Sequence, residues 1–371
     1  MKKIQPLLLF LILVISSCKK NESNLLTINK NAIKFNKFPK EDNVNFSNLF
    51  EYKEGVPQEI HIIDSTLAIS NERKGANYFL YNYSLKSNKL LKGYVAKGKG
   101  PFESIGGGKF GVLKDRIWFY DPSLFKVVFL DKKKFLINNT DSLYQEFNLK
   151  KEDTEEYYFY GSVAFIDSLN FLGINKWGTS SKSKIEKVDL SLNKEIKGFG
   201  KYKEVWNNID ISTIRDAHSS SIGFNYKKNK ALMAYRYSDV LEIYDINSGK
   251  CIATQGPENY DVYFTQDRME QGKGSYYFMG KTKETKKTFV GSAFTDDFIY
   301  LIYSGHKPEN RSESDRFKWQ TGASIFVYDW NGNPVKKINL DRRINTIGVS
   351  NDNETIYSYD LNTGYLIKTN I

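Results

Sequence analysis

Alternating apolar and polar positions, interrupted by short turn sequences, are the dominant pattern of this chain. In residues 324–340 a β-branched and aromatic run stops at Asn331-Gly332, and a second alternating run follows at once. Two such runs separated by Asn-Gly are typical of a β-hairpin with a tight turn. The same pattern predicts hairpins at residues 239–256, 184–200 and, more loosely, 78–95.

A further pair of short strands precedes each hairpin. The two strands of such a pair are joined by a turn rich in Asp, Asn or Ser, and the long periodicity of amphipathic helices is missing. Units of four strands that recur about every 50 residues are typical of a β-propeller. We therefore predict an all-β fold, a six-bladed β-propeller of four-stranded antiparallel blades. The strand pairs that define the six blades are residues 59–70, 109–120, 161–174, 221–235, 290–303 and 345–359.

The last unit is incomplete. Residues 364–371 read as a third strand, and the chain ends without a fourth. A ring that stopped there would leave an open strand edge. Residues 25–38 lie before the first unit and read as strand, so we predict that this N-terminal segment supplies the missing outer strand and closes the ring.

The first residues carry the three parts of a bacterial export signal. Lys2 and Lys3 precede an apolar run at residues 7–15, and small residues follow directly before Cys18. The apolar run is too short to span a bilayer as a helix, so residues 1–17 are predicted to be a cleaved signal peptide. The end of this segment resembles the lipobox of bacterial lipoproteins, and that resemblance implies that Cys18 becomes the first mature residue and carries the lipid. The alternative is an ordinary secretory signal with an incidental cysteine.

Residues 18–24 are predicted to be the lipidated cysteine and a short polar tether, and residues 25–371 to be a single propeller domain. Lys19, rather than Asp, follows Cys18, so the resemblance gives no reason for retention at the inner membrane. We therefore expect an outer-membrane lipoprotein that binds the membrane through Cys18. Its domain faces either the periplasm or the cell surface.

The mature chain is basic. Removing Lys2 and Lys3 with the signal leaves 52 Lys and Arg (54 minus 2) against 43 Asp and Glu, a net charge of about +9. Such a charge favours anionic lipids, polyanionic polysaccharide or acidic partners. The alternative is a solvated basic surface, because the lysines are interleaved with acids. Nucleic acid is not expected as a partner in the cell envelope, and we expect a monomer.

Several segments together resemble a known family, the TolB-like six-bladed propeller lipoproteins of Bacteroidetes-type bacteria. The resemblance covers most of the mature chain from about Pro57 onward, and the chain departs from the commoner glycine-rich form of the first motif at Phe102. These motifs belong to the fold, and the family has no general reaction that could be transferred to particular residues. The segments are GKGPFES at residues 98–104, YDINSGK at 244–250, FVYDWNGNPVKKINLDRRI at 326–344 and IYSYDL at 356–361.

Strand direction divides the connections between two faces of the ring. In an up-and-down blade the first-to-second and third-to-fourth turns lie on one face, here called the turn face, and the other connections lie on the opposite one. Nearly all long segments, residues 201–220, 257–289 and 304–323, fall on this second, loop-rich face. Aromatic and basic residues on loops held by a rigid scaffold are typical of binding sites. The candidate partner-binding residues are Trp206, Arg215, His218, Tyr263, Arg268, His306, Arg316, Phe317 and Trp319.

These long loops also have a plainer interpretation, in which they cover the core of the ring and bury their own aromatic side chains. Candidate catalytic and metal-ligating residues are few. The three histidines, His61, His218 and His306, have no second His or Cys at ligand spacing. Cys251 has no neighbouring His to activate it. We predict no catalytic residue, metal or cofactor.

Two functions follow from this pattern. The first is a non-catalytic binding module, tethered by lipid, that recognises a protein or glycan partner with its loop-rich face. The alternative is an envelope hydrolase or lyase with its site in the central channel, because fold does not decide function. Inward-facing Asp, Glu and Asn side chains that converge on a bound metal in the channel would favour the enzyme, whereas a lining of Tyr, Phe and Lys would favour binding.

Overall fold

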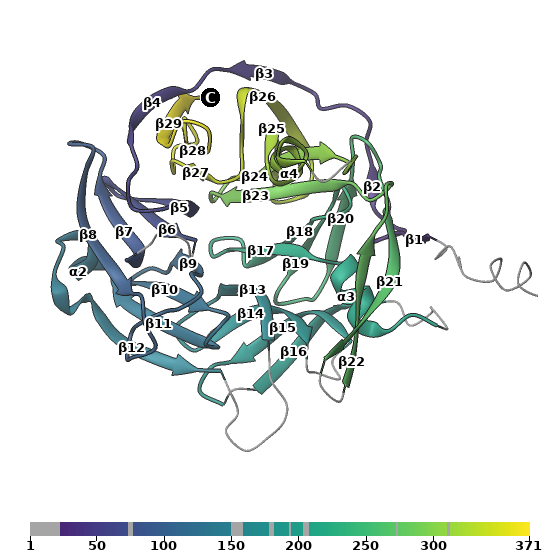
Figure 1. Cartoon of the computed structure of the whole chain (residues 1–371), viewed down its shortest axis with the longest axis horizontal. Coiled ribbons are helices and arrows are strands. Elements are labelled where there is room, and N and C mark those ends of the chain that lie inside the picture. The colour runs from purple at the N-terminus through teal and green to yellow at the C-terminus, as the bar shows by residue number, and fades with distance from the viewer. Residues whose placement is uncertain are drawn as a thin grey trace, which may run out of the picture.

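A computed structural model describes residues 23–72, 77–149, 159–177, 182–192, 194–202, 208–271, 274–309 and 312–371. Six blades are arranged around a central channel, and each has four antiparallel strands running from the channel to the rim (Figure 1). The predicted six-bladed propeller is therefore confirmed. The hairpins and inner strand pairs expected from the alternating pattern all form.

The first three blades follow the repeat predicted from the sequence. Their second and third strands have other strands on both sides and sheets on both faces, so most of their side chains are buried, and in β6 all of them are. Blade 1 contains β5 (Pro57–Ile63), β6 (Thr66–Asn71), β7 (Tyr78–Ser84) and β8 (Lys89–Ala96); blade 2 contains β9 (Lys109–Val112), β10 (Arg116–Asp121), β11 (Lys126–Asp131) and β12 (Leu143–Asn148); blade 3 contains β13 (Phe159–Phe165), β14 (Asn170–Trp177), β15 (Ser183–Asp189) and β16 (Lys194–Lys201).

The last three blades are each extended or completed by strands from the N-terminal part of the chain. Blade 4 contains β17 (Ser220–Asn225), β18 (Lys230–Tyr235), β19 (Val240–Asp245) and β20 (Cys251–Gln255); blade 5 contains β23 (Lys287–Phe294), β24 (Phe298–His306), β25 (Gly322–Asp329) and β26 (Pro334–Ile344); blade 6 contains β27 (Ile347–Val349), β28 (Thr355–Asp360) and β29 (Tyr365–Asn370).

The ring is closed by an N-terminal strand, but not by the one predicted. The outer strand of blade 6 is β4 (Ser47–Glu51), which pairs antiparallel with β29 so that Phe50 lies opposite Leu366. Residues 25–38 were the wrong choice, because they lie on other sheets. We call residues 24–51 the N-terminal strap, since they run along the rim of blades 4, 5 and 6 (Figure 1).

The strap adds one strand to each sheet that it crosses. β1 (Asn24–Leu26) pairs with β21 (Val262–Gln271), β2 (Ile33–Lys34) pairs in parallel with β20, and β3 (Glu41–Val44) pairs in parallel with β26. Each of these strands therefore satisfies backbone groups at an edge that would otherwise be open.

Buried side chains also fix the strap to the ring. Phe38 is 2% exposed and lies 4.9 Å from Phe326 and 5.6 Å from Tyr328 of β25, measured between ring centres. It covers the apolar contact between blades 4 and 5 at the rim. The Asn29 amide donates a 2.7 Å hydrogen bond to the carboxylate of Glu242 on β19.

Glu242 is the centre of a buried polar network between blades 3 and 4. Lys184 of β15 approaches it at 2.8 Å, and the hydroxyls of Tyr235 and Tyr244 donate to it at 2.5 and 2.8 Å. Burial raises the pKa of Glu242, but the charge of Lys184 and the hydrogen bonds outweigh this effect, so the pKa lies below its ordinary value. The carboxylate is therefore held ionised inside the protein.

All three long connections contain secondary structure that the sequence did not lead us to expect, and residues 201–220 contain the helix α3 (Ile211–Ala217). Residues 257–289 form a hairpin of β21 and β22 (Gly274–Lys281), which makes a seventh sheet with β1. Residues 304–323 contain α4 (Glu313–Gln320), and Ser312 caps this helix by accepting a hydrogen bond from the amide of Asp315 at 3.1 Å. The other helical segments among the described residues are α2 (Lys132–Leu136) and η1 (Thr140–Ser142).

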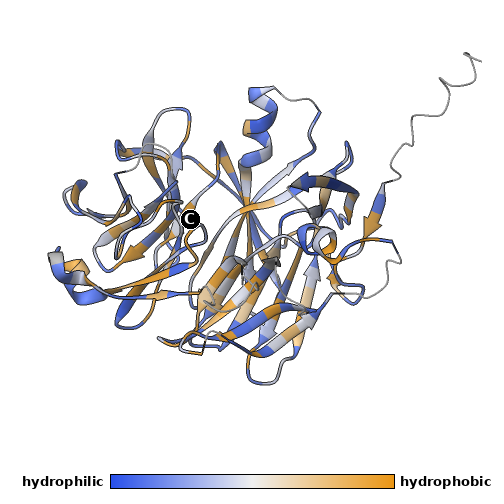
Figure 2. Ribbon diagram, turned by 60° about the horizontal axis from the view of Figure 1, so that its bottom comes forward, coloured by the Kyte–Doolittle hydropathy of each residue, from blue (hydrophilic) through white to orange (hydrophobic). Residues whose placement is uncertain are grey.

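Hydrophobic residues are concentrated in the strands, while turns and helices are mainly hydrophilic (Figure 2). The core is therefore made of the contacts between neighbouring blades, and one apolar cluster fills each contact. Within the described ranges given above, no helix is both long enough and apolar enough to cross a membrane.

Candidate functional site

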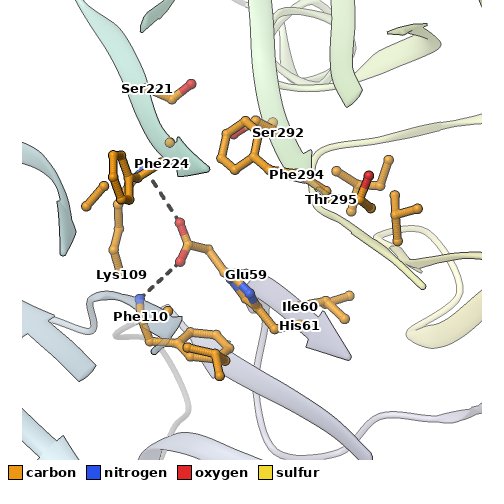
Figure 3. Close-up of a pocket in the computed structure, with 18 of the residues that line it drawn as sticks. Glu59, Ile60, His61, Lys109, Phe110, Ser221, Phe224, Ser292, Phe294 and Thr295 are labelled. Atoms are coloured by element: carbon orange, nitrogen blue, oxygen red, sulfur yellow. Dashed lines mark hydrogen bonds and ion pairs between the residues drawn. The ribbon is translucent and has the colours of Figure 1, made fainter. Parts of the chain in front are cut away.

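The inner strands of all six blades surround a channel that contains a cavity of about 440 Å³. Aromatic side chains from three different blades line it, namely Phe110, Phe224 and Phe294 (Figure 3). The inner strands converge on the axis, so side chains that point away from the blade contacts necessarily meet in this space.

Glu59 and Lys109 form the main polar contact in the channel. The Lys109 ammonium lies 3.5 Å from the Glu59 carboxylate, which also accepts a 3.1 Å hydrogen bond from the amide of Phe110 (Figure 3). Beside them, the ring of His61 lies 4.4 Å from that of Phe110. Burial lowers the pKa of His61; Glu59 opposes this shift and Lys109 adds to it. Around neutral pH His61 is therefore mainly uncharged.

Glu59 is separated from the other carboxylates that line the described part of the channel. Glu59 lies near the start of β5, whereas Asp64 and Asp296 follow the ends of β5 and β23. Five residues of strand separate Glu59 from Asp64, or about 16 Å, which is longer than the separation of a carboxylate pair in glycosidases. Among the residues that the structure describes, no three His, Cys, Asp or Glu side chains are grouped as metal ligands.

The loop-rich face contains a second candidate site, which we call the cation–aromatic cluster. Its centre is Trp319 of α4, whose ring lies 6.3 Å from that of Tyr237 in the β18–β19 loop. Lys281, at the end of β22, has its ammonium 5.4 Å from the Trp319 ring centre, and Lys287, at the start of β23, has its own at 5.7 Å. These are cation–π distances. Three connections that are distant in sequence thus meet around one indole.

Arg236 joins this cluster to the channel. It precedes Tyr237 in the same loop and lines the cavity, so the cluster lies beside the mouth of the channel on the loop-rich face. In the part of the chain that the structure describes, Arg236, Lys281 and Lys287 form no ion pair with an acidic side chain. Burial lowers the pKa of Lys287 to about 7, and the charges of Arg236 and Lys281 lower it in the same direction. Lys287 is therefore only partly protonated around neutral pH, and Arg236 and Lys281 carry most of the positive charge of the cluster.

Two of the predicted partner-binding residues are buried. Arg215, on α3, is 6% exposed, and His218 is 3% exposed. The Nδ1 atom of His218 lies 2.8 Å from the carbonyl oxygen of Ile214, and its ring packs against those of Tyr202 and Tyr235. The plainer interpretation of these loops, that they cover the core, holds here, and Arg215 and His218 are removed from the candidate surface.

The other predicted residues lie nearer the surface. Tyr263 is half-buried beside Tyr260, with ring centres 5.7 Å apart, and Arg268 is exposed on β21, where it contacts Glu270 and Ser275. Neither belongs to the cation–aromatic cluster. The positions of both residues are fixed by the β21–β22 hairpin.

The residues around α4 have different roles. The half-buried His306 holds the helix against β24 through a 2.7 Å contact between its Nε2 and the Asp315 carboxylate. Arg316 is exposed and Phe317 is half-buried. Trp319 is the one predicted residue that the cluster contains, and Trp206 lies outside the described residues.

The comparisons with known proteins concern the fold. A family model described as TolB-like 6-blade propeller-like matches residues 34–352. A solved member of the DUF4221 family from Bacteroides vulgatus is similar with a TM-score of 0.53 and 11% identity, covering 95% of this chain and 98% of its own. A protein from Bacteroides fragilis is similar with a TM-score of 0.50 and 13% identity, covering 92% and 99%. None of the curated proteins matches the chain in sequence.

Proposed function

The chain belongs to the TolB-like 6-blade propeller-like family, and on that premise we propose that it is a non-catalytic binding module of the cell envelope. In this proposal lipid on Cys18 holds the chain at the outer membrane, and the loop-rich face recognises a protein or glycan partner. The fold is consistent with a binding or scaffold role, because a rigid ring positions long loops on one side.

The observation that carries the proposal is the cation–aromatic cluster. An exposed Lys281 and an exposed Arg236 flank half-buried Trp319 and Tyr237. Aromatic rings next to unpaired cations suit a ligand that combines a flat apolar surface with a negative group. Such residues are enriched among those that contribute most to binding.

The channel supports the same proposal. Its aromatic lining and its Glu59–Lys109 ion pair fit the binding alternative, because Glu59, the carboxylate that the described residues place towards the loop-rich end, is already paired with a cation. A hydrolase that used two carboxylates would need them close to one bond of the substrate. In the described channel, Glu59 is separated from Asp64 by the length of β5.

Binding through the loop-rich face is tested by charge reversal at one exposed position of the cluster. We expect Lys281→Glu to weaken retention of envelope partners about tenfold, or ~1.4 kcal/mol, because it places a negative charge where the ligand has one. The assay is a quantitative pull-down from envelope extract with the purified full-length chain. Lys250→Glu is the matched control, since Lys250 is exposed on the turn face.

The melting temperature of both variants is measured first, so that a folding defect is not mistaken for lost binding. Equal retention by Lys281→Glu and Lys250→Glu would contradict the proposal. Loss in both variants would point to a general effect of charge, and the cluster would then have no special role.

Lipid attachment is tested separately. We expect a fatty-acid analogue supplied to growing cells to label the wild-type chain and not Cys18→Ala, because the acyl chains are attached through this residue. Equal labelling of the two chains would show that the lipid, if present, is elsewhere. The single other cysteine, Cys251, is a free thiol on β20, and Cys251→Ala is the control that should keep its label.

A further inference from the structure

The sheet formed by β1, β21 and β22 has one face without a covering layer. Residues directly opposite each other in an antiparallel pair point to the same face, and so do residues two apart on one strand. Met269 pairs with Tyr276, Asp267 with Phe278 and Leu25 with Tyr263. By this parity Leu25, Met269, Tyr276 and Phe278 all lie on one side of the sheet.

The opposite side of the sheet is occupied by α3 and the residues before it. Met279 is 8% exposed there, and the side chain of Gln266 bonds to the backbone of Asn208 and Asp210. Ser212 of α3 donates a 2.7 Å hydrogen bond to the carbonyl of Tyr277. The sheet is thus fixed to the propeller by one face only.

The exposed side chains of the free face are mainly apolar, although Asp267 also lies on this side, where its carboxylate accepts a 3.0 Å hydrogen bond from the hydroxyl of Thr265. Leu25 is 47% exposed, Met269 52%, Tyr276 56% and Phe278 36%. We call these four residues the outer apolar face. A group of exposed apolar side chains on one sheet face usually marks a contact with another molecule or with a membrane, and a Tyr beside aliphatic and aromatic residues suits the boundary between water and lipid.

The position of Cys18 indicates which contact this is. The described chain begins at Ser23, next to β1, and Cys18 is only five residues earlier. A fully extended chain covers at most about 3.6 Å per residue, so the lipid-bearing residue is within about 18 Å of Ser23. If acyl chains on Cys18 enter the bilayer, the sheet that contains β1 is held close to the lipid headgroups.

Charge around the tether acts in the same direction. Lys19 and Lys20 follow Cys18 in the sequence, and the strap presents exposed Lys30 and Lys34 a short distance along the chain. Basic residues within a Debye length of a membrane are attracted to anionic lipids. The lysines of the tether and of the start of the strap are positively charged, and this charge favours contact with a membrane that contains anionic lipids.

We propose that the outer apolar face docks on the membrane surface when Cys18 carries lipid. This inference rests on the proposed lipid attachment, and adds that the domain does not rotate freely on its tether. One rim of the propeller, at the β21–β22 hairpin, lies against the bilayer. The loop-rich face is then presented in a fixed orientation.

The test uses the full lipidated chain, purified from membranes and reconstituted on vesicles of phosphatidylethanolamine with a minority of phosphatidylglycerol. Some of the vesicles contain lipids with brominated acyl chains, which quench tryptophan fluorescence on contact. We expect the tryptophan added by Phe278→Trp to be quenched, and that added by Leu90→Trp to keep its emission. Leu90 is 42% exposed on β8, on the other side of the ring from β1 (Figure 1).

The wild-type chain supplies the fluorescence of the natural tryptophans, which is subtracted. Met269→Trp provides a second probe on the same face if Phe278→Trp alters the melting temperature. Flotation of the vesicles and fatty-acid labelling are recorded on the same samples.

Quenching in both probes, with none at Leu90→Trp, would support the docking. A chain that floats and is labelled, yet shows equal emission from all three variants, would overturn the docked face and leave the lipid anchor intact. Cross-linking of two copies through the outer apolar face on the vesicles would also overturn it, because a second chain would then cover the face. A chain that neither floats nor is labelled would overturn the proposed anchor and the docking with it.

Discussion

Replacing Phe38 by Ala should destabilise the whole propeller, although Phe38 lies outside the repeating blades. Its ring is 2% exposed and lies 5.0 Å from Phe35, 4.9 Å from Phe326 and 5.6 Å from Tyr328. Truncation of such a Phe removes the buried ring and leaves a cavity, at a cost of about 3 to 5 kcal/mol. At about 2.1 cal/mol/K of unfolding entropy per residue, this corresponds to a fall in melting temperature of about 4 to 7 °C.

The matched control is Ile33→Ala, because Ile33 is on the same strap but 66% exposed. Its effect should be within about 0.5 kcal/mol. Both variants are measured by thermal unfolding followed by circular dichroism. If Phe38→Ala melts within a degree of Ile33→Ala, the strap unfolds independently of the ring and does not close the contact between blades 4 and 5.

The polar network and the cation–aromatic cluster lead to further predictions. Glu242→Ala leaves Lys184 buried without its partner, so the free energy of unfolding should fall by about 3 to 5 kcal/mol. Urea unfolding at neutral pH measures this change. A loss below about 1 kcal/mol would show that the network is not essential for stability. The pKa of Lys287 is lowered to about 7 in the folded chain, whereas its pKa in the unfolded chain is near 10.5. Between about pH 7 and 10.5 the unfolded chain therefore binds more protons than the folded chain, and the free energy of unfolding rises with pH across this range. Lys287→Met removes this titration and should therefore raise the melting temperature more at pH 6 than at pH 9.5; an equal effect at both pH values would mean that Lys287 titrates normally.

The repeating part of the fold could be predicted from the sequence because its buried strands are short segments bounded by turn residues. The middle strands are covered on both faces, so segments such as Thr66–Asn71 and Val240–Asp245 are buried almost throughout. The closing strand Ser47–Glu51 is an edge strand with largely exposed side chains, and this pattern is weak. Residues 25–38 are more apolar because Phe38 and its neighbours pack on other blades, and this made them the better candidate from sequence alone.

The helix α4 was missed for a different reason. Residues 304–323 contain many charged residues, and α4 has little apolar periodicity, which indicated a loop. The capping pattern Ser312-Glu313-Ser314-Asp315, in which a serine precedes an acid by three positions, is a helix start signal that the sequence did contain. The hairpin of β21 and β22 was equally hard to see, because α3 covers only one of its faces.

The candidate site could be predicted only in part. Trp319 was identified because it is an aromatic residue in a polar insertion, and the two-face rule placed that insertion correctly. Tyr237, Lys281 and Lys287 come from separate connections with no common motif, so their meeting around one ring required the structure. His218 was expected at the surface because it lies in a long connection, but its ring packs inward against that of Tyr235.

Binding through the loop-rich face is the central claim, and site-specific photo-cross-linking in living cells tests it most directly. A photoreactive amino acid is placed at Arg316, which is exposed on α4, or at Asn331, which is exposed in a tight turn on the opposite face. The account predicts cross-links to a specific partner from position 316 and none above background from position 331. Cross-links from position 331 alone, or equal cross-links to the same partner from both positions, would contradict it.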